Sequence, residues 1–288
     1  MTRRPVSLRA LAATAAASAL ALSACAGGSA PAQSNAAASG AQSGQLATVT
    51  PGKLTIATGE PAFSPWVEND DPASGEGFEA AVAYAVAEEL GFSKENVVWK
   101  RTTFDAAIAP GAKDWDFNLQ QFAITDERKQ AVDFSSSYYT TAQAVLTTAD
   151  KPIASATSLA QIKDTQFGVQ VGTTSKKVVD EVIAPSKQAL TFNGSVDVVQ
   201  ALKNGQVEAI VVDLPTALYL SAAEFDNGKI IGQFEDTTGG EDFGLVLPKG
   251  SALTPQVTAA VDKLRENGTL KELETKWLSD AVKVPVLK

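Results

Sequence analysis

Apolar and polar residues follow an alternating strand and helix pattern from about residue 51 onward. Lys53 to Thr58 is a short β-branched run that predicts a buried strand, and it gives way to the turn-rich segment 59–66. Apolar residues then recur at helical spacing from Phe78 to Leu90, just before Gly91, which predicts an amphipathic helix with a glycine stop. This region therefore predicts the first strand and helix of an α/β fold.

The same pattern continues along the rest of the chain. Further strands are predicted at 97–100, 117–124, 166–171, 207–212 and 243–247. Helical segments are predicted at 104–109, 175–183, 195–204, 255–267 and 270–278, with Ser195 as the cap of its helix. This order indicates two α/β units with mostly parallel sheets, and binding sites in such folds lie beyond the carboxyl ends of the strands.

The N-terminal region has a different composition. Three arginines among its first nine residues precede an apolar run that ends at Cys25, the layout of a bacterial lipoprotein signal that is cut before a lipidated cysteine. The run is too short to span a membrane. We expect residues 1–24 to be a signal peptide, Cys25 to carry a lipid anchor, and residues 25–51 to form a flexible tether. The alternative is that Cys25 is an ordinary buried thiol.

Charge and composition exclude several classes of function. The formal net charge is −9, and removal of the signal peptide with its three arginines would change it to −12. Such an acidic chain is not expected to bind nucleic acid or an anionic lipid surface, because both require clustered Lys and Arg. The sequence has no histidine and one cysteine, which excludes histidine triads, histidine metal sites and thiolate clusters. We expect a monomer without metal or cofactor.

Four polar groups at predicted strand ends suit a zwitterionic ligand. Arg128 follows a strand, and its guanidinium can bind a carboxylate through two hydrogen bonds. Thr173 and Thr174 lie in a glycine turn before a helix, where hydroxyls and free N–H groups attract an anion. Asp213 ends an apolar strand and suits an ammonium group. Glu60 lies in the first strand-to-loop turn.

Each of these residues also has a purely structural interpretation. Arg128 could form a surface ion pair, and Asp213 could cap a helix that begins at Leu214-Pro215. Glu60 could be a solvated turn residue, the Gly172-Thr173-Thr174 segment could be an ordinary turn, and the nearby Phe63 and Trp66 could belong to the core. Their occurrence in order, within two α/β units of an exported chain, favours a binding site.

From about Lys53 to Asp280 the chain resembles the amino-acid-binding lipoproteins of polar amino-acid ABC importers, the bacterial extracellular solute-binding proteins of family three. The segments that carry the resemblance are Gly59–Trp66, Gly77-Phe78-Glu79, Ile124–Arg128, Asp133-Phe134-Ser135 with Tyr138-Tyr139, Gly168–Thr174, Gly205–Asp213 and Gly244–Gly250.

The resemblance implies an α/β, periplasmic-binding-protein-like fold, in which two sheets are joined by a two-strand hinge and the ligand cleft lies between two lobes. The expected boundaries are 52–141 and 238–280 for lobe 1, 142–237 for lobe 2, and 281–288 for a C-terminal tail. In the family pattern Arg128 and the Thr174 region hold the α-carboxylate of the ligand. Asp213 holds its α-ammonium group, and Phe63 and Phe104 cover its side chain.

The chain departs from the family pattern before Ile124. Gln120 and Gln121 are larger than the residues usual in the family, so the pocket is expected to be either smaller or richer in amides, and Gln170 is a further expected ligand-binding residue. Ala123 lacks a hydroxyl that often contacts the ligand backbone. Glu60 resembles the acidic residue of relatives that bind basic or amide side chains, which favours a cationic or amide-bearing ligand.

The leading interpretation is a binding protein and not an enzyme. A lipid-tethered protein on the outer face of the bacterial plasma membrane would capture a polar amino acid or related amine and deliver it to an ABC importer permease. A dehydratase-like enzyme on the same scaffold is one alternative, with Glu60, Asp213 or Glu241 supplying the acid or base. An extracellular sensor is the other.

Overall fold

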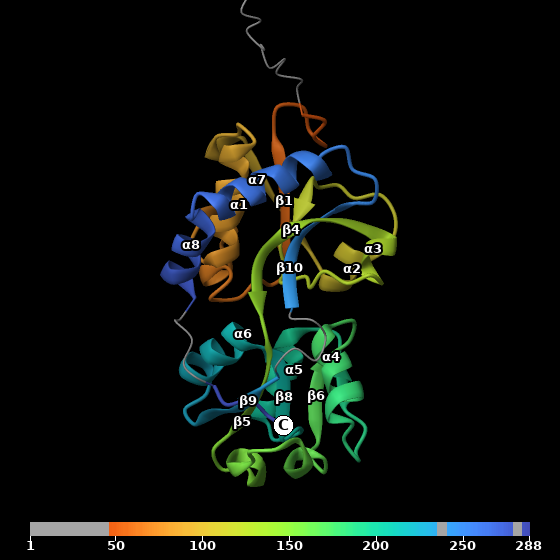
Figure 1. The fold of residues 1–288 in the computed structure, drawn as a ribbon, viewed down its shortest axis with the longest axis vertical. Helices are drawn as coiled ribbons and strands as arrows, with labels where there is room; N and C mark the ends of the chain where they lie inside the picture. The colour runs from red at the N-terminus through yellow and green to blue at the C-terminus, as the bar shows by residue number, and fades with distance from the viewer. Residues whose placement is uncertain (1–45, 235–240, 279–283) are drawn as a thin grey trace, which may run out of the picture. The chain divides into compact units, whose positions relative to one another are not determined.

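The computed structural model of the chain describes residues 46–234, 241–278 and 284–288. In this part the chain forms two lobes, each built on a five-stranded sheet (Figure 1). The first sheet contains, in spatial order, β2 (Val97–Thr102), β1 (Leu54–Gly59), β3 (Phe117–Asn118), β10 (Glu241–Pro248) and β4 (Val132–Thr141). The second contains β7 (Leu190–Phe192), β6 (Phe167–Gln170), β8 (Ala209–Asp213), β5 (Gln143–Thr148) and β9 (Gly228–Gln233).

Both sheets are mixed: in each, four strands run in one direction, as expected of a mostly parallel sheet, and one strand runs against them. In the first sheet β10 runs antiparallel to β3 and β4, and in the second sheet β5 runs antiparallel to β8 and β9. The other pairings are parallel. The reason is the path of the chain. Strands β5 and β10 begin at the cleft, where the chain enters their lobes. The parallel strands end at the cleft, so they run in the opposite direction.

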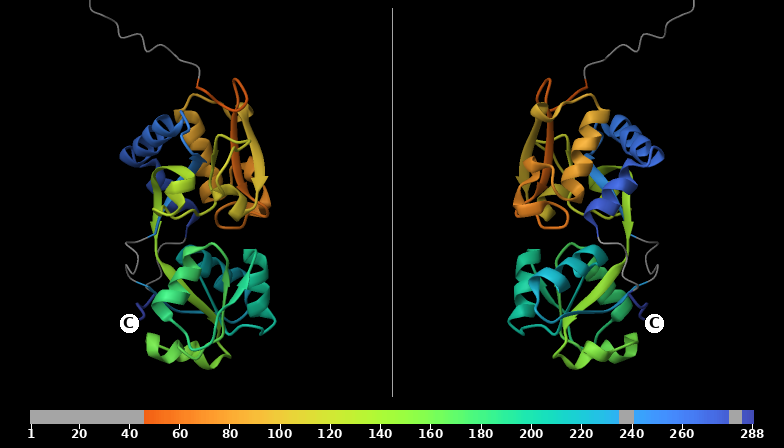
Figure 2. Two further views of the ribbon diagram at one scale, coloured as in Figure 1. Left: turned by 90° about the vertical axis from the view of Figure 1, so that its right-hand side faces the viewer. Right: turned by 90° about the vertical axis from the view of Figure 1, so that its left-hand side faces the viewer.

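The core of the first lobe lies on both faces of its sheet. Three helices cover one face: α1 (Phe78–Glu89), α7 (Thr254–Glu266) and α8 (Thr269–Trp277) (Figures 1 and 2). Apolar residues of α1 and α7 pack there against β1, β3 and β10, as the helical periodicity from Phe78 predicts. On the other face a smaller cluster includes α2 (Phe104–Ile108), and α3 (Arg128–Ala131) leads into β4.

The second lobe also has a core on each face of its sheet. Val145 of β5 packs with the helical segment that starts at α4 (Thr174–Lys177) and continues as a π-helix over Val178–Ile183. The flanking residues Ala144 and Leu146 pack on the opposite face with α5 (Ser195–Lys203) and α6 (Leu214–Tyr219). Successive side chains of a strand point to opposite faces, so β5 contributes to both cores.

Short helical segments complete the secondary structure. They are the 3-10 helices Glu68–Asp70, Pro72–Ser74, Lys94–Asn96, Pro152–Ser155 and Leu159–Ile162, and the π-helix Leu220–Glu224.

Two sequence-based expectations about single elements are wrong. The strand expected over 117–124 ends at Asn118, because Gln121 has a φ of 49° in the left-handed region and the backbone leaves the sheet. Ser195 does not cap α5: Gly194 is the N-cap, and the Ser195 hydroxyl instead donates to the Gln170 side chain at 2.7 Å. Strands β4, β5, β7 and β9 were not predicted from apolar periodicity.

The chain connects the two lobes at three places. Only Ala142 separates β4 from β5, and the chain returns between β9 and β10. After α8 in the first lobe, residues 284–288 lie on the second lobe. There Val286 bridges β9 in parallel, and Leu287 is buried in the core. The described part of the expected C-terminal tail therefore belongs to the second lobe.

The folded region begins before Pro51. Leu46 packs against the core of the first lobe, and the backbone N–H of Val49 donates to Asp116 at 2.8 Å. Residues 46–50 are therefore held by the first lobe, although their composition indicated a tether. The signal peptide, Cys25 and the remainder of the expected tether lie outside the described residues.

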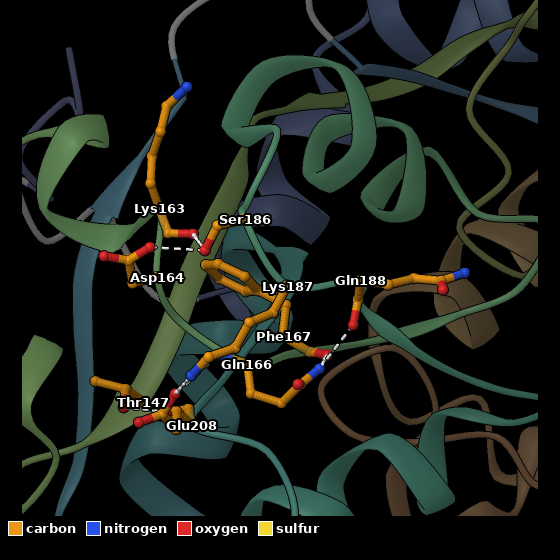
Figure 3. A network of polar contacts seen from close by, with 9 residues as sticks. All are labelled: Thr147, Lys163, Asp164, Gln166, Phe167, Ser186, Lys187, Gln188 and Glu208. Carbon is orange, nitrogen blue, oxygen red and sulfur yellow. Dashed lines mark hydrogen bonds and ion pairs between the residues drawn. The ribbon is translucent and has the colours of Figure 1, made fainter.

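A polar network fastens the amino ends of β6 and β8, at the end of the second lobe away from the carboxyl ends of these strands (Figure 3). Glu208 accepts a hydrogen bond from the Gln166 backbone at 2.8 Å and faces the Lys187 ammonium at 3.8 Å. The Thr147 hydroxyl donates to the Glu208 carbonyl at 2.6 Å, and Ser186 donates to Asp164 at 2.6 Å. This network leaves the carboxyl ends of the strands available for a site.

Candidate ligand-binding site

A cavity of about 370 Å³ lies at the carboxyl ends of β1, β6 and β8, between the two lobes. All ten residues that the sequence predicted for the ligand site line this cavity: Glu60, Phe63, Phe104, Gln120, Gln121, Arg128, Gln170, Thr173, Thr174 and Asp213. They come from segments up to about 150 positions apart in the chain, and the fold brings them together.

Arg128 lies at the start of α3 and is buried, with 8% of its surface exposed. One of its terminal nitrogens donates to the Ala123 carbonyl at 2.8 Å, and the other donates across the cleft to the Gly172 carbonyl at 3.0 Å. The guanidinium carbon lies 5.3 Å from the ring centre of Phe104 and 5.9 Å from that of Phe122. Arg128 is therefore held in place by both lobes and two aromatic rings.

Arg128 has no acidic side chain within ion-pair distance in the part of the chain that the structure describes. Burial lowers the pKa of Arg128, and the more distant charges of Glu241, Asp213 and Glu127 oppose this effect. A guanidinium has five N–H donors, so the two hydrogen bonds to carbonyls leave donors that a ligand carboxylate can use. The geometry does not fit the surface ion pair considered as an alternative.

The Gly172 to Ser175 turn presents hydroxyl groups to the same cavity. Gly172 has a φ of 75°, which favours glycine, and Thr173 caps α4 by accepting from the Lys176 N–H at 3.2 Å. The Thr173 hydroxyl also donates its one proton to the Gln170 carbonyl at 2.8 Å, so it has no proton left to donate to an anion. Among the described residues the Thr174 hydroxyl has no hydrogen-bond partner, which leaves it available to an anion.

Asp213 ends β8 directly before α6. It occupies the N-cap position, but its side chain makes no capping hydrogen bond. Its carboxylate instead accepts from the Gln143 amide at 2.5 Å. Burial raises the pKa of Asp213 well above its usual range, and the neighbouring Glu241 raises it further. The helix-cap interpretation therefore does not describe this side chain, whose carboxylate lines the cavity.

The opposite part of the cavity is built from the first lobe. Glu60 is exposed, and Phe63 keeps 42% of its surface exposed. Phe104 packs on Phe122 with ring centres 4.6 Å apart. The side-chain oxygen of Gln120 is buried without a hydrogen-bond donor from the described residues. This region offers aromatic walls, one carboxylate and amide groups.

Trp66 has two roles in the structure. It packs in the core of the first lobe against Phe78, Tyr139 and Phe243, and only 2% of its surface is exposed. Its indole N–H also lines the cavity and donates across the cleft to the Thr216 hydroxyl at 3.0 Å. Trp66 is therefore both a core residue and a wall of the cavity.

Gln121 is fixed by a buried carboxylate beneath the cavity. Its backbone N–H donates to Glu79 at 2.7 Å, and its side-chain amide and the Tyr138 hydroxyl donate to the same carboxylate. Glu79 has 1% of its surface exposed, and this burial raises its pKa from 4.5 to about 7. The left-handed turn at Gln121 thus depends on a carboxyl group that titrates near neutral pH.

Several lining residues were not predicted from the sequence. Asn193 and Ser195 come from the β7 to α5 turn, and Thr216 and Tyr219 come from α6. The Asn-Gly-Ser order at the start of α5 was the available signal for the first two, because it repeats the strand, turn and helix order of the Gly172 segment. The α6 residues carry no local signal, since only packing decides which side of this helix faces the cavity.

The comparison with known protein families agrees with this geometry. Residues 54–280 match the family described as bacterial extracellular solute-binding proteins, family 3. The chain belongs to this family. Its fold is the two-lobed fold of amino-acid-binding proteins, and the family places it outside the cytoplasm. No cluster of His, Cys, Asp or Glu suited to a metal ion occurs among the described residues of this solute-binding protein.

Individual relatives are amino-acid-binding proteins. The glutamine-binding protein of an ABC transporter of Bacillus subtilis is 30% identical over 216 residues, which cover 73% of this chain and 76% of that protein. The structure of an ancestral arginine-binding protein bound to glutamine is 32% identical with a TM-score of 0.67, covering 80% of this chain and 100% of the other. An ancestral amino-acid-binding protein, a precursor of cyclohexadienyl dehydratase, is 28% identical with a TM-score of 0.65, covering 79% and 96%.

Replacement of Glu79 by glutamine should change how stability depends on pH. With a pKa of 4.5 when unfolded and about 7 when folded, Glu79 ionises first in the unfolded chain as pH rises. Its contribution to the free energy of unfolding is therefore present below pH 4.5 and is lost by about pH 7. The loss should be about 3 kcal/mol.

Denaturant unfolding at several pH values, on wild type and Glu79→Gln, measures this effect. The difference between the two profiles cancels the other titrating groups. If the free energies of unfolding of wild type and Glu79→Gln change in parallel from pH 4.5 to 7, the raised pKa of Glu79 is contradicted.

Replacement of Arg128 by methionine should abolish binding of an α-amino acid while the fold is kept. Removal of one partner of a buried charge pair costs about 2–5 kcal/mol, equivalent to roughly 30-fold to several thousand-fold in affinity. Calorimetric titration measures the loss, and circular dichroism verifies the fold. Lys129→Met is the matched control, because the neighbouring Lys129 is exposed and pairs with Asp126 outside the cavity. Equal affinity of Arg128→Met and wild type would exclude Arg128 from the site.

Proposed function

We propose that this solute-binding protein captures a polar L-amino acid with a cationic or amide side chain and delivers it to an ABC importer permease. The observation that carries the proposal is the pair formed by Arg128 and Asp213. A buried arginine without a carboxylate partner among the described residues and a carboxylate from the other lobe line the same cavity. These two groups suit the two charges of a zwitterion.

The proposed carboxylate position combines Arg128 with the turn before α4. Arg128 has unused donors toward the cavity, and the Thr174 hydroxyl is available beside them. Gly172 brings its turn close to the first lobe, since a Cβ at this position would lie 2.8 Å from Asp105. A ligand carboxylate in this position would therefore contact both lobes.

The proposed ammonium position is the Asp213 carboxylate. One of its oxygens accepts from Gln143, and a carboxylate has further lone pairs for an ammonium group. Gln170 stands beside the same region and accepts from Ser195 at 2.7 Å, so its amide has a fixed orientation. The ammonium and carboxylate positions together require a free α-amino acid or a close analogue.

The proposed side-chain position lies between Phe63, Phe104 and the Gln120 amide, with Glu60 at its edge. The negative charge of Glu60 acts on the nearby Arg101 guanidinium, and Arg101 also forms an ion pair with Asp70. Two carboxylates around one guanidinium leave a net negative charge there, which favours a cationic or amide side chain. Glutamine and arginine in the names of the relatives support the same class of ligand.

Delivery to a permease requires that the lobes close over the ligand. Residues from both lobes form the cavity, so the contacts that they share with a ligand are complete only when the lobes approach each other. The short connection through Ala142 is suited to act as a hinge. The partner is the permease of an ABC importer, as in the family, and we propose that the protein acts as a monomer.

A panel of the twenty amino acids, tested by thermal shift and then by calorimetry with product analysis, examines the proposal. Stoichiometric binding of arginine, lysine or glutamine without turnover is the expected result. Conversion of the ligand would support the dehydratase-like alternative. This alternative is tested because one similar structure is that of a precursor of cyclohexadienyl dehydratase. Absence of binding by all twenty would overturn the proposed function.

Replacement of Glu60 by glutamine should weaken the binding of arginine more than that of glutamine. Because Glu60 is exposed, the expected loss for arginine is about two- to tenfold, with little change for glutamine. Fluorescence titration measures both affinities. Glu76→Gln is the matched control, since Glu76 is exposed on the same lobe and does not line the cavity. Equal losses for both ligands, or tightest binding of aspartate or glutamate, would remove Glu60 from the site.

We also propose that Cys25 is lipidated and holds the protein on the outer face of the membrane. The basic and apolar residues before Cys25 support this proposal. In the described part of the chain no helix is long and apolar enough to cross a membrane.

Cys25→Ala should release the protein from bacterial membranes and leave ligand affinity unchanged, because residue 25 precedes the folded lobes. Fractionation of cells and medium measures the release, and titration of the released protein measures the affinity. Retention of Cys25→Ala in the membrane fraction would contradict the anchor.

A further inference from the structure

Two carboxylates meet behind the proposed ammonium position. Asp213 ends β8 in the second lobe, and Glu241 begins β10, where the chain returns to the first lobe. The side-chain amide of Gln143 donates to both of them, at 2.5 Å to Asp213 and 2.5 Å to Glu241. The Ser175 hydroxyl donates to the oxygen of the same amide at 2.6 Å, which fixes the direction of the amide.

Glu241 is buried, with 4% of its surface exposed, and its second carboxylate oxygen receives no hydrogen bond from the described residues. Within that part of the protein it has no ion pair either. A buried carboxylate without a cation is costly, and a like charge beside it adds to the cost. A proton on the neighbouring Asp213 lowers this cost.

The charged and titratable groups around the pair come from several elements. Among the described residues they are Arg128 on α3 and the phenols of Tyr138 and Tyr139 on β4, all of which feel the Asp213 charge. Tyr138 in turn donates to Glu79 on α1. Arg128 is the cation of this group, and its own donors point to the Ala123 and Gly172 carbonyls.

We propose that Glu241 is a positioning residue of the ammonium site: with Gln143 it orients Asp213 and favours a proton on Asp213, which the ammonium group of an entering ligand displaces. The O–H bond of Asp213 breaks, the proton passes to solvent, and the ammonium N–H groups bind the Asp213 carboxylate. Burial and the neighbouring carboxylate raise the pKa of Asp213, in agreement with this arrangement.

The inference rests on the proposed function, because it needs an ammonium group at Asp213. Its consequence is that binding is coupled to release of up to about one proton per ligand, and that affinity rises by up to about tenfold per pH unit over the range of release. A site without Glu241 would keep the effect of burial on Asp213 and lose only the contribution of the second carboxylate, so it would release fewer protons on binding.

Calorimetric titration with L-glutamine and L-arginine, in two buffers of different ionisation enthalpy, counts the protons released. Measurements at about pH 5, 6 and 7 keep the ligand ammonium charged. We expect release by wild type, clearly smaller release and a flatter pH profile for Glu241→Gln, and normal release for Asp242→Asn. Asp242 is the matched control because it neighbours Glu241 on β10 but is exposed and accepts from Thr140.

Binding by wild type without proton release at all three pH values would overturn this inference alone and leave the proposed function intact. Equal release by Glu241→Gln and wild type would also overturn it. Glu79→Gln decides the source of the proton, because Glu79 titrates near neutral pH as well. Release that persists in Glu79→Gln supports the Asp213 and Glu241 pair, and release lost in that variant would assign the proton to Glu79.

Discussion

A guanidinium group that is taken out of water needs hydrogen-bond acceptors on several sides, and Arg128 obtains them from both lobes. The Ala123 carbonyl of its own lobe and the Gly172 carbonyl of the other lobe satisfy part of the group, and the rings of Phe104 and Phe122 lie nearby. The remaining donors are the groups that bind the ligand carboxylate in the proposed site. The cleft is therefore organised around one incompletely satisfied cation.

The acidic groups of the site follow the same principle with the opposite sign. Asp213 and Glu241 lie together around the Gln143 amide, and Glu79 lies beneath Gln121, where it accepts from three donors and has no ion pair with any described residue. Burial favours the protonated forms of Asp213 and Glu79, because it raises the pKa of both groups. The charge state of the pocket is thus determined by burial as much as by the number of acidic residues in the chain.

Much of this arrangement could be predicted from the sequence. The helical periodicity from Phe78 identified α1, and the apolar run before Asp213 identified β8, because burial on a regular element leaves a local periodic signal. Asp213 at the end of an apolar strand was predicted for the site and lines the cavity, and Arg128 also lines it, although the strand expected before Arg128 ends at Asn118. Strand β4, with its polar sequence, lacks such a signal and was missed.

The sequence by itself determined the acidic charge, the absence of histidine, part of the order of strands and helices, and ten of the residues that line the cavity. Only the tertiary structure decided the left-handed turn at Gln121, the position of residues 284–288 on the second lobe, and the contact of Gln143 with Asp213 and Glu241. Gln143 is 70 positions from Asp213 and 98 positions from Glu241 in the chain. Such contacts depend on strand register and on the path of the chain between the lobes, which local periodicity does not specify.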